Sequence, residues 1–197
     1  MEPFNWTFQF ALAVLLYLVL FAINQLVRFV TPVDLKSFTD TDNVKSISGI
    51  LFSLGGAVSA ISVIFIGPSV FKSGRIGPML AIAFMFVAVS LLGMGFAPSI
   101  VIYGAAFLLM AFLVSAMVPV TNMLIAANVS RARRGTAFGI AASAQAVALF
   151  IGPGGGALFG AFSYDLGFAI SAALMLAVGL FLFISLKEPK AAEAAAT

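Results

Sequence analysis

The sequence predicts an all-α integral membrane protein with six transmembrane helices. Of its 197 residues, 62% are hydrophobic and only 9% are charged, whereas about 25% of an ordinary soluble domain is charged. Six apolar stretches are long enough to cross a hydrocarbon core, which needs about 20 residues of helix. Most basic residues gather in alternate connections, as they do in chains that cross a membrane repeatedly.

The first three predicted spans cover residues 6–30, 46–68 and 78–96. The first follows Glu2 rather than a basic segment and lacks a small-residue cleavage pattern, which favours a permanent span over a signal peptide. The connection after it, 31–45, is the longest; it holds three aspartates and is too short to fold alone. The second span ends in a Gly-Pro pair, and the third follows a basic loop.

The last three predicted spans cover residues 99–126, 136–162 and 168–186. The fourth contains a proline near its end, which predicts a bent helix beside a cavity or simply a tolerated kink. The fifth follows an arginine-rich loop and contains a glycine-rich run. The sixth is followed by a polar cytoplasmic tail at 187–197, so the chain forms one six-span domain.

The distribution of basic residues predicts that both termini lie in the cytoplasm. This arrangement places seven of the ten basic residues on the cytoplasmic side, and the inverted arrangement would reverse that seven-to-three bias. We therefore expect an integral protein of a plasma membrane, specifically a bacterial inner membrane. The seven residues are Lys72, Arg75, Arg131, Arg133, Arg134, Lys187 and Lys190.

Several function classes are disfavoured by what the sequence lacks. It contains neither cysteine nor histidine, and the predicted spans contain no paired carboxylates, so we expect no enzyme activity, metal site or cofactor. The net charge of +3 is spread over separate loops as a topology signal and predicts no nucleic-acid partner.

The second and fifth spans resemble each other. In both, a glycine is followed four residues later by a serine, and the sequence Phe-Ile-Gly-Pro comes further on. This is the correspondence expected for a 3+3 inverted repeat, although a Gly-rich chain also produces short matches by chance. The matching residues are Gly49, Ser53 and 65–68 in the second span, and Gly139, Ser143 and 150–153 in the fifth.

The loop after the second span carries a motif typical of a known family. Gly67, Lys72, Gly74 and Arg75 are in register with the pattern G-x-x-x-D-R-x-G-R, whose acidic position is Phe71 here. The chain thereby resembles the major facilitator superfamily, and specifically one six-helix half of a twelve-helix drug or metabolite exporter. The resemblance implies transmembrane transport of a small-molecule substrate by alternating access.

The fifth span carries a second motif of this family. Gly152, Pro153 and Gly156 are in register with the antiporter pattern G-P-x-x-G-G, whose last glycine is Ala157 here. The degenerate motifs and the short polar tail favour the C-terminal half. The spacing of the glycines makes a further prediction that does not depend on the family. Because Gly152, Gly156 and Gly160 recur every four residues, we expect a neighbouring helix to approach closely there.

Polar residues within the spans are the candidates for a substrate pathway, because such residues are costly in a bilayer. Asn24, Gln25 and Arg28 lie near the outer end of the first span, where they would contact a polar or anionic substrate. Alternatively, Arg28 extends to the headgroups and the amides bond neighbouring helices. The remaining candidates are Asn122, beside Pro119, and Gln145, which lies in an alanine-rich run that also suits close packing.

A single half would leave its cavity face against lipid. We therefore expect, besides the lipid bilayer, a parallel homodimer or a separate N-terminal six-helix half as partner. The predicted spans contain no Asp or Glu, so a carboxylate for proton coupling would lie elsewhere. The alternatives are a non-transporting membrane scaffold or regulatory protein, or an inactive fragment of a transporter.

Overall fold

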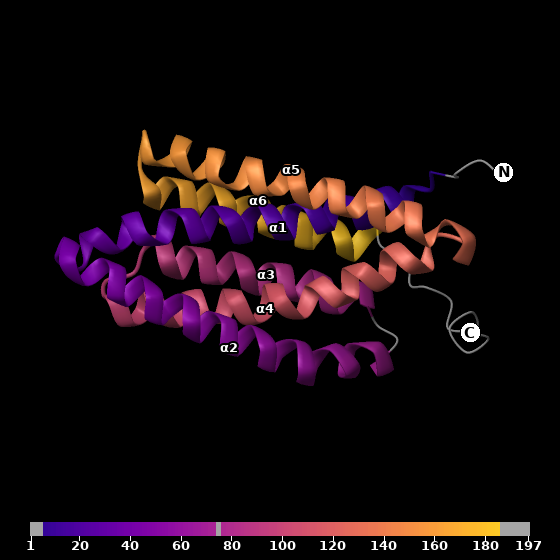
Figure 1. The fold of residues 1–197 in the computed structure, drawn as a ribbon, viewed down its shortest axis with the longest axis horizontal. Helices are drawn as coiled ribbons and strands as arrows, with labels where there is room; N and C mark the ends of the chain where they lie inside the picture. Colours follow the sequence, from indigo (N-terminus) through magenta and orange to yellow (C-terminus); the bar gives the residue numbers. More distant parts are fainter. Residues whose placement is uncertain (1–5, 74–75, 186–197) are drawn as a thin grey trace.

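The protein is a bundle of long, roughly parallel and antiparallel helices (Figure 1). The computed structural model describes residues 6–73 and 76–185, with the backbone alone at 41–42 and 67–73. Within this part of the chain, six helices are long and apolar enough to cross a membrane, which confirms the predicted architecture. The helical elements are α1 Phe8–Asp34, η1 Leu35–Ser37, α2 Thr41–Ser73, α3 Ile76–Gly95, α4 Ile100–Ala127, η2 Arg131–Arg133, α5 Arg134–Gly160 and α6 Tyr164–Ser185.

Local sequence explains where several helices begin. Thr7 caps α1, because its hydroxyl accepts a hydrogen bond from the backbone N–H of Phe10 at 3.2 Å. Ser99 caps α4 in the same way through the N–H of Ile102, at 3.5 Å. Helix α3 has 20 residues, which at 1.5 Å per residue gives about 30 Å, the thickness of the hydrocarbon core.

The connections beside α2 are shorter than the sequence predicts. Helix α1 continues through Pro32 to Asp34, and α2 already begins at Thr41. At its other end α2 continues through Gly67 and Pro68 to Ser73, so the expected loop is largely helical. A proline costs one backbone hydrogen bond, but a helix in a membrane satisfies its remaining backbone groups internally and therefore continues.

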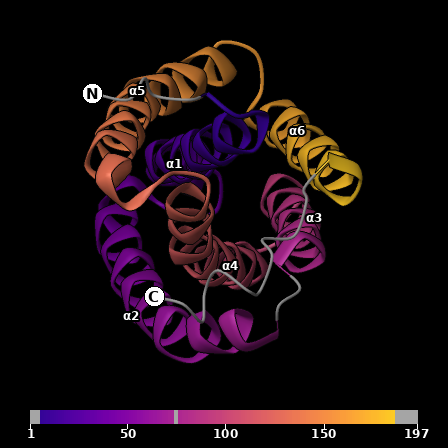
Figure 2. The same cartoon turned by 90° about the vertical axis from the view of Figure 1, so that its right-hand side faces the viewer.

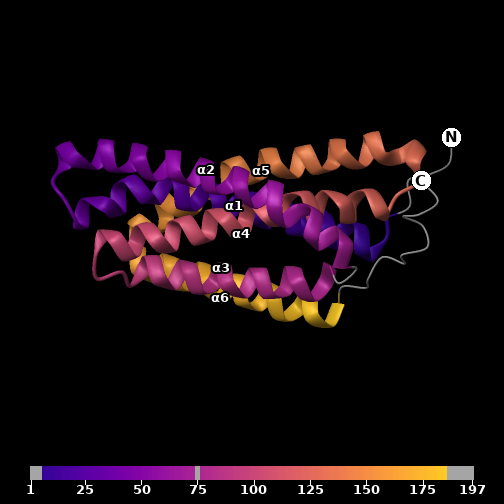
Figure 3. The ribbon, with the colours of Figure 1, turned by 90° about the horizontal axis from the view of Figure 1, so that it is seen from below.

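Helices α1 and α4 lie at the centre of the bundle. Seen along its length, α3 and α6 lie together on one side, and α2 and α5 lie along the other (Figure 2). The most extensive contacts join α3 to α6, α1 to α5 and α2 to α4. The close pairing of α3 with α6 along their length is also visible in Figure 3.

This pairing has the pattern of two three-helix units. Exchanging α1–α3 with α4–α6 turns the α1–α5 contact into α4–α2 and leaves the α3–α6 contact unchanged. One contact breaks the pattern, because α3 packs extensively on α4 whereas α6 barely contacts α1. The exchange therefore relates the two three-helix units only approximately.

The core extends along α1, α3 and α4 and includes an aromatic group near one end. Tyr103 of α4 is fully buried, and its ring centroid lies 5.8 Å from that of Phe38 and 6.4 Å from that of Phe168. The Tyr103 hydroxyl donates a hydrogen bond to Thr31 at 3.1 Å. At the other end, Gln9 donates to the backbone carbonyl of Ser185 at 3.0 Å, so α1 begins beside the end of α6.

Candidate functional site

A line of polar side chains runs along one side of α1. Tyr17, Asn24 and Arg28 are separated by seven and four residues and therefore share a helix face at 3.6 residues per turn. Tyr17 is buried, Asn24 is half-buried and Arg28 is exposed. Because polar groups in a span usually face the protein interior or water, this face is the candidate pathway surface of α1.

One hydrogen bond connects this face of α1 to α5. The Tyr17 hydroxyl donates to Oε1 of Gln145 at 3.4 Å, a long and therefore weak bond. The Tyr17 ring also packs on Phe21, at a centroid distance of 4.7 Å. Gln145 is half-buried. The structure thus brings the predicted pathway residue Gln145 to the polar face of α1, through a tyrosine that the sequence analysis did not select.

Gln25 lies at the contact between α1 and α5 rather than on the open polar face. A Cβ atom added at Gly152 would lie 2.6 Å from the Cβ of Gln25, which shows how closely the two helices approach. The base of the Gln25 side chain is therefore part of the helix packing. Gln25 is half-buried and follows Asn24 directly in the sequence, but it lies on a different side of α1.

Asn122 lies on α4, five residues before its end at Ala127, and is half-buried. Its neighbour Thr121 is fully buried and donates to the backbone carbonyl of Met117 at 2.8 Å, an arrangement common for Thr within a helix. In the part of the chain that the structure describes, no hydrogen bond joins Asn122 to the polar residues of α1. The candidate pathway residues therefore lie on three helices without forming one hydrogen-bonded cluster.

The glycine-rich run of α5 packs against α1. Besides Gln25, a Cβ atom at Gly152 would meet the backbone oxygen of Ala22 at 2.7 Å and the backbone nitrogen of Leu26 at 2.9 Å. A Cβ atom at Gly156 would meet Phe29 at 2.8 Å and Val30 at 3.0 Å. These two glycines allow the backbones to approach, as expected for small residues four apart.

The other glycines of the run differ in what they face: a Cβ atom at Gly155 would lie 3.4 Å from the side chain of Leu26 on α1, whereas Gly154 and Gly160 do not contact α1. At Gly160, an added Cβ atom would meet the hydroxyl of Tyr164 at 2.6 Å, so this glycine accommodates the first residue of α6. At Gly154, the position has no atom within 4 Å, and Pro153 is half-buried. Of the three glycines that recur every four residues, Gly152 and Gly156 therefore contact α1, whereas Gly160 contacts α6.

The basic motif after the second span lies mostly beyond what the structure shows in detail. Gly67 and Lys72 belong to α2, whose side chains are not described there, and Gly74 and Arg75 lie outside the described residues. The motif therefore begins in a helix and not in the loop that the sequence predicted.

Two hydrogen-bonding positions were missed by the sequence analysis. Ser62 is fully buried on α2 and donates to the backbone carbonyl of Phe112 on α4 at 2.6 Å. Tyr17 was missed although its spacing of seven from Asn24 places both on one helix face. Serine in a span has no comparable spacing signal, because it bonds equally well to its own helix, as Ser90 does to Phe86 at 2.9 Å.

Comparison with known proteins agrees with this architecture. A search of curated proteins found no match. A sequence model of the Major Facilitator Superfamily, however, matches residues 14–197, which is nearly the whole chain and covers α1 from residue 14 and all of α2 to α6. Proteins of this family are secondary transporters and not enzymes. With six candidate membrane spans and a match along almost its full length, this integral membrane chain belongs to the Major Facilitator Superfamily.

Proposed function

We propose that this chain is one six-helix half of a secondary transporter that moves a small molecule by alternating access. The observation that carries the proposal is an uncovered face on α2 and α5. Only 17% of the apolar window of α2 and 28% of that of α5 is buried within the chain, compared with 50% for α1 and for α3. A second six-helix unit packed on α2 and α5 would cover this face and enclose the polar side of α1.

The glycines support this interpretation. In the described part of the chain, every glycine whose added Cβ atom would meet nothing within 4 Å belongs to α2 or α5. Glycine is costly within a helix unless a close contact uses it, and in membranes small residues allow helices to pack closely. The open glycines are therefore suited to contacts with another chain. They are Gly49, Gly56, Gly135, Gly139 and Gly154.

The partner is a six-helix half, supplied either by a second copy of this chain or by a separate N-terminal half. A second copy inserts with the same charge-directed orientation, so a twofold axis along the membrane normal relates the two copies. That axis has the same direction as the axis relating the halves of a twelve-helix transporter. The degenerate motifs at 67–75 and 152–157 favour the C-terminal half of an exporter-like protein.

In this proposal the polar residues on α1, α4 and α5 contact the substrate. Arg28 provides a positive charge suited to a polar or anionic substrate, while Asn24, Asn122 and Gln145 offer amide donors and acceptors. Both termini lie in the cytoplasm of a bacterial cell, because the basic connections then obey the positive-inside rule. The partner half supplies any intramembrane carboxylate for proton coupling.

Cysteine labelling tests whether water reaches the polar face of the bundle. The chain has no natural cysteine, so Asn24→Cys, Asn122→Cys and Gln145→Cys are each single-cysteine proteins without further changes. In native membranes we expect a membrane-impermeant maleimide to label all three. The matched control is Leu174→Cys on α6, which is 54% exposed in the isolated bundle and would face lipid.

The competing function is a membrane scaffold that transports nothing. A scaffold has no water-filled pathway, so all three polar positions would be protected to the same extent as Leu174→Cys. That result would refute the transporter proposal. Labelling of the three positions together with protection of Leu174→Cys would support it.

A further inference from the structure

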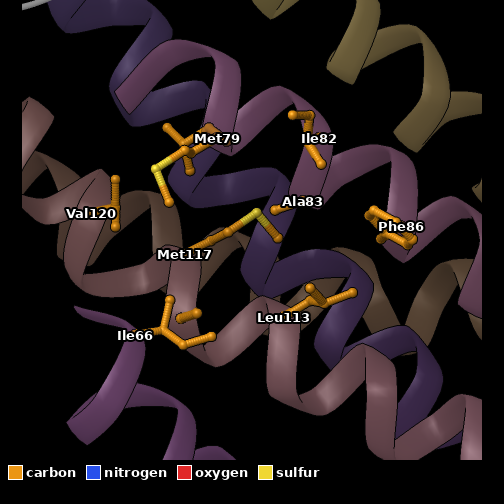
Figure 4. A pocket seen from close by; sticks show the side chains of 10 residues that line it. Ile66, Met79, Ile82, Ala83, Phe86, Leu113, Met117 and Val120 are labelled. Carbon is orange, nitrogen blue, oxygen red and sulfur yellow. The ribbon is translucent and has the colours of Figure 1, made fainter. Parts of the chain in front are cut away.

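A cavity of about 310 Å³ lies between α2, α3 and α4, away from the polar face (Figure 4). Its described lining residues come from α2, α3 and α4 and include none of the candidate pathway residues, although Asn122 also lies on α4. The lining side chains are Ile66, Met79, Leu80, Ile82, Ala83, Phe86, Leu113, Ala116, Met117 and Val120.

The described lining of the cavity is apolar. Its ten described side chains are hydrocarbon or thioether groups, and the thioethers of Met79 and Met117 extend into it from facing helices (Figure 4). Two alanines, Ala83 and Ala116, leave the space that larger side chains would fill. A dry cavity of about 150 Å³ already accepts benzene-sized guests, so this one has room for a longer hydrocarbon.

The position of the cavity relates it to one leaflet of the membrane. Met79 is in the first turn of α3 and Phe86 is ten residues from its start at Ile76, a rise of about 15 Å or half of a 30 Å core. The cavity therefore occupies the leaflet at the end where α1 begins and α6 ends. Ile82 and Phe86, 46% and 52% exposed, line its mouth on the outer surface of the bundle.

We propose that this cavity binds one acyl chain of a phospholipid from that leaflet. If the cavity were empty, its lining side chains would lose dispersion contacts. If water filled it, the water would find no hydrogen-bonding partner there. A phospholipid tail is apolar and flexible, and it is present at the mouth at very high concentration. The two methionines adapt their shape to such a guest.

Charge selects the headgroup. The end of the bundle nearest the cavity also carries Arg131, Arg133 and Arg134, whereas Asp34 and Asp165 lie at the opposite end. Basic groups at a membrane surface attract anionic lipids. The occupant is therefore an anionic phospholipid such as phosphatidylglycerol, whose tail enters between α2 and α3.

Photolabelling of the full chain in lipid nanodiscs tests this site. The probe is phosphatidylglycerol with a diazirine in one acyl chain, and mass spectrometry of peptides maps the adducts. We expect adducts on Met79, Ile82 and Met117 to exceed those on exposed Leu174 and Leu180 of α6 several-fold. Equal labelling of the cavity and of α6 would mean ordinary boundary lipid and would overturn the proposal.

Filling the cavity gives the second test. Ala83→Phe occupies the space and should abolish the excess labelling at Met79 and Met117, while Ala177→Phe on the exposed face of α6 should leave it unchanged. If Ala83→Phe does not fold, the smaller change Ala83→Leu should reduce the excess. Excess labelling that survives both fillings, or that an unlabelled fatty acid displaces as well as phosphatidylglycerol does, would contradict a phospholipid tail in this cavity.

Discussion

The packing of α5 on α1 leads to a prediction for a pair of glycines two residues apart. In Gly152→Ala the new methyl group would lie 2.6 Å from the Cβ of Gln25, 2.7 Å from the oxygen of Ala22 and 2.9 Å from the nitrogen of Leu26. Ordinary van der Waals contacts begin at about 3.4 Å, and two of the three atoms are backbone, which cannot rotate away. In Gly154→Ala the methyl group would meet nothing within 4 Å.

The magnitude follows from comparing the two variants. Replacing a helical glycine by alanine stabilises the helix by about 1 kcal/mol, and this gain is common to both variants. The difference in their free energies of unfolding is therefore the cost of the close contact, about 1–3 kcal/mol for overpacking a filled interface. Gly152→Ala should be the less stable protein by that amount, and Gly154→Ala should match or exceed the unmodified chain.

The assay is reversible unfolding in mixed micelles with increasing SDS, followed by helix circular dichroism. Micelles are suitable because Gly154 lies on the face that we assign to a partner, and the isolated chain leaves it open. Equal stability of the two variants would show that α1 and α5 adjust without cost. The close approach of these helices would then not be the reason for glycine at position 152.

Three further predictions concern other contacts. Ser62→Ala should lower the free energy of unfolding by about 1 kcal/mol in the same assay, because Ser62 donates to the carbonyl of Phe112 at 2.6 Å; an unchanged stability would show that this bond is not formed. Tyr103→Phe should cost a similar amount by removing the 3.1 Å hydrogen bond to Thr31, and Thr31→Val in that background should add less than it does alone. Gly49→Leu should not lower the stability of the isolated chain but should weaken its association with a partner half, measured by co-purification; unimpaired association would exclude Gly49 from the interface.

The sequence predicted the helices well because apolar length is a direct physical requirement of the bilayer. Helix α1 continues beyond its predicted span through Pro32, and α2 continues beyond Pro68, because a proline is tolerated where a membrane helix must satisfy its own backbone. The spacing of Gly152 and Gly156 predicted a close contact, but only the structure identifies α1 as the neighbour.

The candidate site was less accessible to sequence reasoning. Asn24, Gln25 and Arg28 lie close together in the sequence, yet Gln25 faces the contact with α5 and Arg28 is exposed. The hydrogen bond from Tyr17 to Gln145 joins residues 128 positions apart, and no local pattern encodes such a pairing. The apolar cavity was not predicted either, because its lining comes from three helices whose residues resemble those of any lipid-facing span.

We propose that another six-helix unit covers the face made by α2 and α5. The most direct test places a photoreactive amino acid at Ser53, an exposed position of α2, and compares it with Leu174 on α6 in the native membrane. We expect Ser53 to crosslink to a second copy of this chain or to a separate six-span chain of the same superfamily, identified by mass spectrometry, and Leu174 to crosslink to lipid. Lipid adducts alone at both positions would contradict it.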